Sequence, residues 1–152
     1  MKIINTSDIN QARKEIQQFK KSKLSIIIQA QGDDFNRKIL ENKDIDILIS
    51  PELHQRKDKL KQRDSGLNEV LCKLAKKNDV KIAIDLKQIQ KLSKQDKAIA
   101  LARIMQNIKL CKRTKTHLVI LSKGKFKKQD ISSLFLTLKA STQQAKEAFD
   151  FN

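Results

Sequence analysis

Short apolar runs rich in β-branched residues alternate with helix-patterned segments along this 152-residue chain. The apolar runs predict five strands, at residues 3–4, 24–30, 45–49, 80–86 and 117–121. Because strands that alternate with helices form βαβ units, the pattern predicts a parallel sheet with right-handed crossovers. Five units are fewer than a closed barrel needs. We therefore expect residues 1–152 to form one α/β domain with an incomplete TIM-barrel-like sheet, either open or closed by a partner.

Polar residues predict where several of the helices begin. Ser7, Asp33 and Asp130 are the expected N-caps of three helices, and residues 141–144 match a capping box. The longest helix, predicted near residues 96–113, carries an apolar stripe on one face. Its opposite face is expected to present three cations, Arg103, Lys109 and Lys112.

The chain is strongly basic, with 33 Lys and Arg against 17 Asp and Glu and a formal net charge of +16. Such a field attracts polyanions, and the phosphate backbone of a nucleic acid is the partner most often implied. A genome biased in base composition also raises the lysine content, although it does not account for so few acids. Aromatic residues make up only 4% of the chain and are all Phe, which disfavours a platform for stacking bases.

Other classes of protein fit this composition poorly. No segment reaches the ~20 apolar residues of a membrane span, and the N-terminus lacks the apolar stretch of a secretory signal. Cys72 and Cys111 are far apart and match neither a zinc site nor a disulfide framework. We therefore expect a cytoplasmic protein with no membrane partner.

The positive charge is concentrated in segments 54–63, 109–115 and 122–128. The first and third follow predicted strands, and loops that follow parallel strands emerge on the same face of a sheet. The two loops are thus expected to converge on one rim, although each run alone is also typical of a solvated surface. Lysine supplies point charges that suit phosphates without reading base identity. The candidate RNA-binding residues in these segments are Arg56, Lys57, Lys59, Lys61, Arg63, Lys112, Arg113, Lys123, Lys125, Lys127 and Lys128.

The sequence offers no self-contained active site. A metal-dependent phosphoesterase would need clustered His, Asp and Glu, but His54 and His117 are the only histidines. Asp46 and Asp85 lie in predicted strands and are expected to be structural, and Cys111 lies on an apolar stripe and is expected to be buried. We expect no catalytic residue, no metal ligand and no cofactor bound by the chain itself.

Two stretches, residues 63–86 and 100–124, resemble archaeal ribonuclease P protein component 3, the family that includes the thirty-kilodalton subunit of eukaryotic ribonuclease P. Residues 134–149 resemble the closing helices of that family. The resemblance is carried by a basic loop that ends in Asp-Ser-Gly-Leu and by polar residues and a Leu-Cys-Lys end on the long helix that follows. The positions carried by these motifs are Arg63, Asp64, Ser65, Gly66, Arg103 and Asn107.

The resemblance implies a barrel of the polymerase-and-histidinol-phosphatase type without that superfamily's metal ligands. It also implies a noncatalytic subunit of the ribonucleoprotein that removes the 5′ leader from precursor tRNA, in which the RNA is the catalyst. The implied partners are ribonuclease P RNA, protein component 2, other ribonuclease P proteins and, indirectly, precursor tRNA, with Mg²⁺ expected on the RNA. Ser65 and Arg103 join the candidate RNA-binding residues on this basis.

This chain departs from the family pattern in two places. We expect the first strand–helix units of the family to be missing at the N-terminus, and Ser122-Lys123-Gly124 stands where the family has Ser-Gly-Ala. We therefore expect the sheet edge at Ile3–Ile4 to be covered by a partner or by self-association. Two other readings stay open: a different basic RNA-binding protein, such as a ribosome or tRNA factor, and a barrel phosphoesterase.

Overall fold

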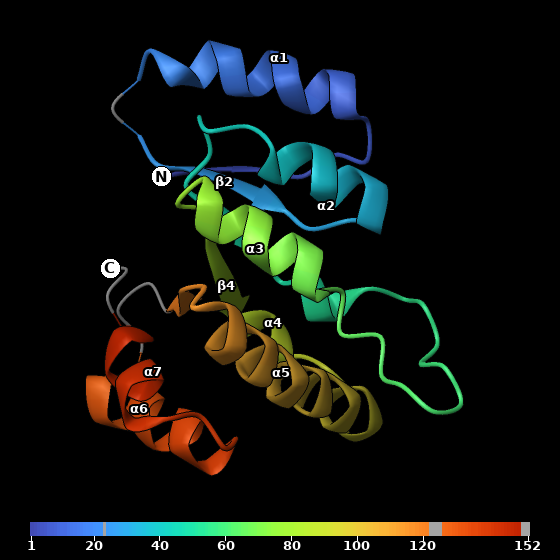
Figure 1. Ribbon diagram of the computed structural model, residues 1–152, viewed down its shortest axis with the longest axis vertical. Coiled ribbons are helices and arrows are strands. Elements are labelled where there is room, and N and C mark those ends of the chain that lie inside the picture. The colour runs from blue at the N-terminus through green and yellow to red at the C-terminus, as the bar shows by residue number, and fades with distance from the viewer. Residues whose placement is uncertain (23, 122–125, 150–152) are drawn as a thin grey trace.

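The computed structural model describes residues 1–22, 24–121 and 126–149, and within them one five-stranded sheet is flanked by helices (Figure 1). The strands are β1 (Lys2–Ile4), β2 (Ile26–Gln29), β3 (Ile47–Ile49), β4 (Lys81–Asp85) and β5 (Leu118–Leu121). The α-helices are α1 (Ile9–Lys20), α2 (Asp33–Leu40), α3 (Glu69–Lys77), α4 (Leu86–Gln90), α5 (Lys94–Thr114), α6 (Lys128–Thr137) and α7 (Thr142–Glu147). A 3-10 turn, η1 (Pro51–Leu53), follows β3. Each predicted strand is present, most of them a few residues shorter than the apolar run that predicted it.

The sheet is parallel throughout, in the order β1-β2-β3-β4-β5. Ile27 pairs with Ile3 on one side and Ile47 on the other, so the register is continuous from strand to strand. Neither β1 nor β5 pairs with a second strand in the described part of the chain, and the sheet is open. The predicted α/β fold is confirmed, and the open sequential sheet is the geometry of an incomplete barrel.

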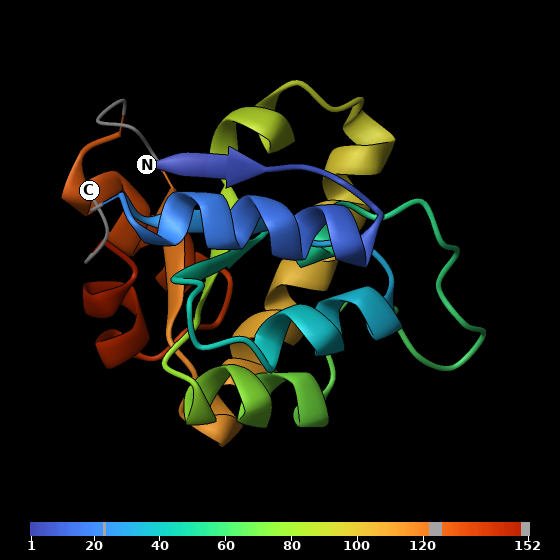
Figure 2. The same cartoon turned by 90° about the horizontal axis from the view of Figure 1, so that it is seen from above.

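The main core lies between the sheet and the helices. Alternate strand residues such as Ile28, Leu48 and Ile82 point into it and meet apolar side chains of the helices. Figures 1 and 2 show α1, α2, α3 and α5 following one another along the sheet, as sequential right-handed crossovers require. A smaller cluster occupies the other face of the sheet and is made by Ile27, Ile47, Ile49, Ala83, Val119 and Leu121.

Three predicted helix caps are wrong, and the fourth is confirmed. Asp8, one residue after Ser7, caps α1 by accepting from the backbone N–H of Asn10. Asp33 and Asp130 lie inside the first turns of α2 and α6, where a carboxylate favours the helix dipole without capping. The box formed by Ser141 and Gln144 opens α7 as predicted.

Asp46 and Asp85 have the structural roles that the sequence predicts, and Cys111 is buried as predicted. Asp46 accepts a hydrogen bond from the Ile26 N–H at 2.7 Å, and Asp85 caps α4 by accepting from the Lys87 N–H at 2.9 Å. Cys72 and Cys111 are both buried free thiols. Among the helices described, none is long and apolar enough to cross a membrane.

Candidate nucleic-acid interface

Arg103, near the middle of α5, anchors the long loop between η1 and α3. Its guanidinium donates to the backbone oxygens of Glu52 (3.1 Å), His54 (3.0 Å) and Arg56 (2.7 Å). Its Nε also donates to the Asp58 carboxylate at 3.2 Å. The expectation that Arg103 is exposed is wrong, because the loop folds back over α5 and leaves the residue only 6% exposed. The N–H groups of its guanidinium donate to oxygens of the loop. This corrects the prediction that Arg103 contacts RNA.

The Asp58 carboxylate completes this anchor. Its partial desolvation favours the neutral acid, but hydrogen bonds from the Asp64 N–H and from Arg103 outweigh that effect and lower the pKa of Asp58. Asp58 is therefore ionised at neutral pH, and the loop is held by a charge-assisted pair in addition to backbone hydrogen bonds.

The base of the loop is closed by His54, Arg56 and Asp64. Nε2 of His54 lies 2.7 Å from the backbone oxygen of Asp64, and Nδ1 accepts from the Arg56 N–H at 3.2 Å. Burial lowers the pKa of His54, and the Arg103 charge acts in the same direction. The neutral ring makes both contacts, one through each of its nitrogens. The Arg56 guanidinium donates to Asp64 and to Asp33 of α2, each at 3.1 Å. Arg56 thus ties the loop to a neighbouring helix.

The end of the loop is fixed by close backbone packing. Gly66 adopts φ +76°, and a Cβ at this position would lie 1.9 Å from the Pro51 carbonyl oxygen. Asn107 of α5 donates to the Ser65 backbone oxygen at 3.2 Å. Ser65 is fully buried and its hydroxyl points to the Leu67 oxygen, which corrects its assignment to the RNA surface. Ser65 of the loop and Asn107 of α5, which lie far apart in the sequence, are therefore in contact and fix the end of the loop.

Glu52 is a buried acid in η1 that the sequence reading missed. It is 1% exposed, and its carboxyl oxygens have no hydrogen-bond partner among the described residues. Burial raises the pKa of Glu52 to about 8, and the nearby Asp85 charge acts in the same direction. The side chain is therefore mostly neutral at pH 7.

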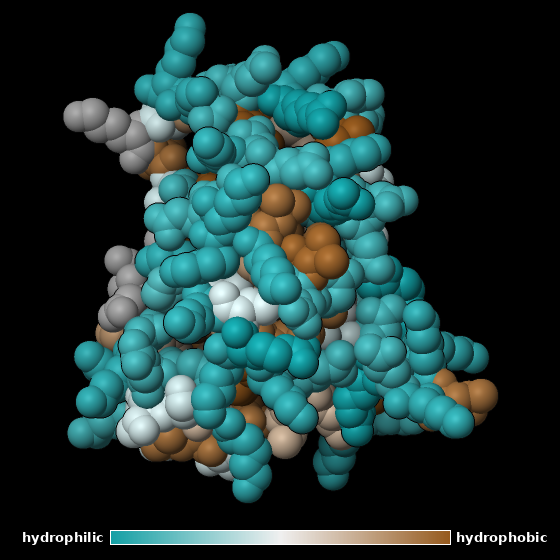
Figure 3. All heavy atoms as spheres, in the orientation of Figure 1, coloured by the Kyte–Doolittle hydropathy of each residue, from teal (hydrophilic) through white to brown (hydrophobic). Residues whose placement is uncertain are grey.

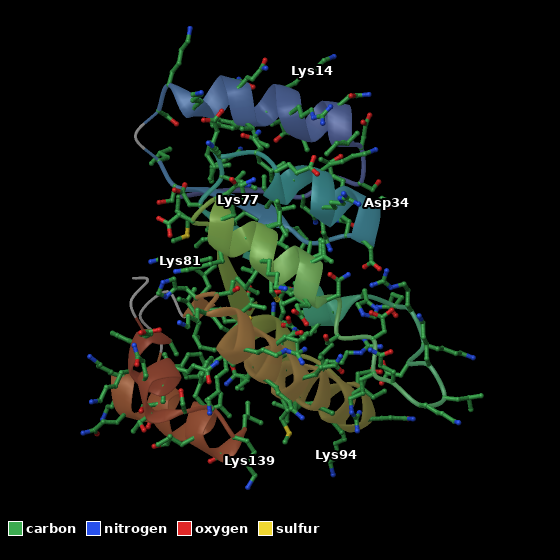
Figure 4. The ribbon with its side chains drawn as sticks, in the orientation of Figure 1. Lys14, Asp34, Lys77, Lys81, Lys94 and Lys139 are labelled. Carbon is green, nitrogen blue, oxygen red and sulfur yellow. The ribbon has the colours of Figure 1, made fainter. Side chains whose placement is uncertain are left out.

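A basic groove of about 760 Å³ lies between the loop and the outer face of α5. Ala102, Met105 and Ile108 contribute apolar lining, and none of the described lining residues carries a carboxylate. We call this surface the α5 groove, and its cations are Lys61, Arg63, Lys109, Lys112 and Lys139. Figure 4 labels Lys139 just beyond α6, far along the molecule from Lys14 on α1. Three of the predicted residues, Lys61, Arg63 and Lys112, are thus brought together.

The remaining predicted cations do not share this groove. Lys57 and Lys59 are exposed on the loop, whose tip forms a tight bridge between Lys59 and Gln62. Arg113 lies 3.5 Å from Glu69 of α3, in an exposed ion pair. Figure 3 shows the same largely hydrophilic face that Figure 1 presents, with only small apolar areas between polar side chains.

The predicted convergence of two basic loops is wrong for the part of the second loop that the structure describes. Lys127 and Lys128 begin α6, which Figures 1 and 2 place on the opposite side of the molecule from the loop after η1. Each strand of a sheet is rotated by roughly 20° from its neighbour, so the exits of β3 and β5 diverge. Lys123 and Lys125 lie outside the described residues.

Two contributors to the α5 groove were not among the predicted site residues. Lys139 is an isolated lysine after an apolar helix, and only the packing of α6 near α5 brings it to the groove. Lys109 lies on the polar face that the sequence predicts for α5, but it is not among the predicted binding residues. Within the ranges described, no group of three or more His, Cys, Asp or Glu is placed to hold a metal ion.

The sequence of this chain is similar to those of known proteins. Ribonuclease P protein component 3 from Methanococcus maripaludis is 32% identical over 120 residues, which is 78% of this chain and 48% of that protein. By sequence, the chain is similar to ribonuclease P protein component 3 over about half of that protein's length. The component 3 proteins of Methanococcus vannielii and Methanocaldococcus jannaschii match at 31% and 30% identity over 80% and 77% of the chain. No protein-family model matches.

A comparison with solved structures points to the same kind of protein. A chain of the cryo-EM structure of archaeal ribonuclease P with mature tRNA superposes with a TM-score of 0.79 and 28% identity. The match covers 96% of this chain and 62% of that chain. This chain spans about half the length of the curated component 3 proteins that it matches.

Replacing Arg103 with Met should destabilise the protein by about 2–4 kcal/mol, because three backbone carbonyls and a carboxylate lose their shared donor. Urea unfolding measures the change. Arg113→Met on the same helix is the matched control, since Arg113 is exposed and makes one surface ion pair, and it should cost less than about 1 kcal/mol. Equal losses in the two variants would contradict the anchoring role of Arg103.

The raised pKa of Glu52 predicts a pH-dependent stability. The unfolded acid titrates near 4.5 and the folded acid near 8, so its stabilising contribution is complete below pH 4.5 and is lost as the pH rises to 8. Between these values the wild type should lose up to about 1.4 kcal/mol per pH unit relative to Glu52→Gln, which cannot ionise. Urea unfolding of both proteins at pH 5, 6.5 and 8 tests this. A difference that stays constant with pH would mean that Glu52 titrates normally.

Proposed function

We propose that this chain is a noncatalytic protein subunit of ribonuclease P, the ribonucleoprotein that removes the 5′ leader from precursor tRNA. The observation that carries the proposal is the relationship to component 3 together with a groove that gathers five cations and no described carboxylate. The fold match to a chain of an archaeal ribonuclease P structure supports the same assignment.

The proposed partners follow from this role. They are ribonuclease P RNA, protein component 2 and other ribonuclease P proteins, with precursor tRNA contacted indirectly, and the setting is the cytoplasm. Mg²⁺ is expected on the RNA and not on this chain. The lysines would offset part of the phosphate repulsion, so that the catalytic RNA folds compactly at lower Mg²⁺ concentration.

The α5 groove is the surface that we assign to the RNA backbone. Four of its five cations are lysines, which act as point charges for phosphates without the bidentate geometry that reads a base. Lys57 and Lys59 on the exposed loop would extend the positive field beyond the groove. The buried anchor at Arg103 keeps this loop beside α5, so that Lys61 and Arg63 face Lys109 and Lys112 across the groove.

In a second candidate role, the chain is a ribosome or tRNA factor, and the same groove binds a different RNA through the same contacts to phosphates. The two roles differ only in which RNA is bound. The relationship to component 3 favours ribonuclease P RNA.

Lysines of the α5 groove should account for much of the RNA affinity. The variant Lys61→Ala/Lys112→Ala/Lys139→Ala should bind ribonuclease P RNA at least tenfold more weakly than the wild type at 150 mM salt. If each lysine contacts one phosphate, the slope of log K against log salt should fall by about 2–3 in magnitude. Filter binding across a salt series measures both quantities.

The matched control is Lys14→Ala/Lys21→Ala/Lys43→Ala, which removes the same charge from exposed positions on and beside α1 and α2. The control should keep most of the affinity and the wild-type slope. An equal loss in both variants would mean that net charge, and not the groove, determines binding.

A further inference from the structure

Leu60 lies at the tip of the loop between η1 and α3, and the fold leaves it entirely in solvent. It is 106% exposed, whereas the other exposed large apolar residues of the described chain range from 36% to 60%. Figure 1 shows the loop extending away from the sheet and the helices, and Figure 3 shows an apolar area at its outer end among hydrophilic side chains. Single exposed apolar residues are ordinary on protein surfaces, and what distinguishes Leu60 is the way in which the fold holds it.

The turn that carries Leu60 is short and closed by backbone contacts. The Gln62 N–H donates to the Lys59 oxygen at 3.2 Å, and the two residues form an antiparallel bridge. Leu60 and Lys61 are the two central residues of this turn, and neither has a positive φ. The leucine is therefore presented on an unstrained, hydrogen-bonded turn.

The loop is fixed to α5 close to the tip. Asp58, two residues before Leu60, accepts from the Arg103 Nε at 3.2 Å and from the Asp64 N–H at 3.0 Å. Arg103 also donates to the Arg56 oxygen at 2.7 Å. Both arms of the loop are thus tied within four residues of Leu60. A side chain on a loop that is already ordered loses less conformational freedom on binding than one on a mobile segment.

The side chains around Leu60 favour RNA over protein as the partner. Residues 57–63 contain four cations and one acid, and that acid, Asp58, is paired with Arg103 at 3.1 Å. Lysine is depleted in the cores of protein–protein interfaces, whereas its point charge suits the phosphates on either side of a nucleotide. The four cations, all exposed, are Lys57, Lys59, Lys61 and Arg63.

We propose that Leu60 is an apolar wedge that contacts the face of an unpaired base in the bound RNA, at a bulge or a helix junction, while the cations around it contact the adjacent phosphates. Lys61 and Arg63 also line the α5 groove, so Leu60 lies beside the surface assigned to the RNA backbone. Leucine is among the side chains that separate stacked bases in nucleic-acid complexes, and unstacking costs least where a base is already unpaired. The inference rests on the proposed RNA-binding function and adds the feature of the RNA that the loop recognises.

The test uses two synthetic RNA hairpins of equal length, one fully paired and one with a single bulged 2-aminopurine. The full chain should bind the bulged hairpin about tenfold more tightly, as partial burial of a leucine side chain predicts. The fluorescence of the 2-aminopurine should rise on binding, because the base is unstacked from its neighbours.

Variants at Leu60 separate an apolar contact from a charge effect. Leu60→Ala should abolish both the preference for the bulge and the fluorescence rise, whereas Leu60→Met should keep them. Leu60→Lys should bind both hairpins more tightly, because it adds a cation, and yet lose the preference. Val70→Ala on α3 is the matched control, since Val70 is an exposed aliphatic residue outside the loop, and it should keep both properties.

The lysine variant Lys61→Ala/Lys112→Ala/Lys139→Ala distinguishes this inference from the function on which it rests. It should weaken binding to both hairpins by the same factor and leave the preference for the bulge unchanged. Equal binding of both hairpins by the wild type, or a preference that survives in Leu60→Ala, would overturn the wedge and leave the RNA-binding function standing. Binding of neither hairpin would overturn both. A Leu60→Ala variant that keeps the preference but loses a protein partner would assign Leu60 to a protein contact instead.

Discussion

The buried guanidinium of Arg103 is the contact on which the functional surface depends. The loop between η1 and α3 has few apolar side chains of its own, so hydrogen bonds to Arg103 replace a hydrophobic core. One side chain reaches three backbone oxygens and one carboxylate, which lysine cannot do because it lacks a planar fork of donors. Gly66 and Asn107 secure the end of the same loop. The exposed cations of the loop are consequently held at a fixed place beside α5.

The helix α5 combines two roles on two faces. Arg103 and Asn107 point into the molecule and fix the loop, whereas Lys109 and Lys112 point outward and line the α5 groove. The chain has about half as many acids as bases, and several acids are engaged in the loop itself. In the groove, Arg63 lies 3.9 Å from Asp58, and the four lysines supply the excess positive charge that permits counterion exchange with a phosphate backbone.

Much of the fold follows from local sequence patterns, and most of the site does not. The five strands and the burial of Cys111 were predictable because apolar periodicity reports directly on burial. The burial of Arg103 was not, because it depends on a loop about fifty residues earlier in the chain folding back onto α5. Lys139 reaches the groove only through the packing of α6, and the exits of β3 and β5 diverge through sheet twist. The motif residues Ser65 and Arg103 were predicted to contact RNA, but both are buried in the contacts that hold the loop against α5.

The identity of the bound RNA tests the central claim most directly. Ultraviolet crosslinking of this protein in its own cells, followed by sequencing of the attached RNA, measures it without assuming a partner. The account predicts enrichment of one structured RNA with the features of ribonuclease P RNA, crosslinked through residues of the α5 groove. Enrichment of ribosomal RNA or mature tRNA instead, with no ribonuclease P RNA, would contradict it.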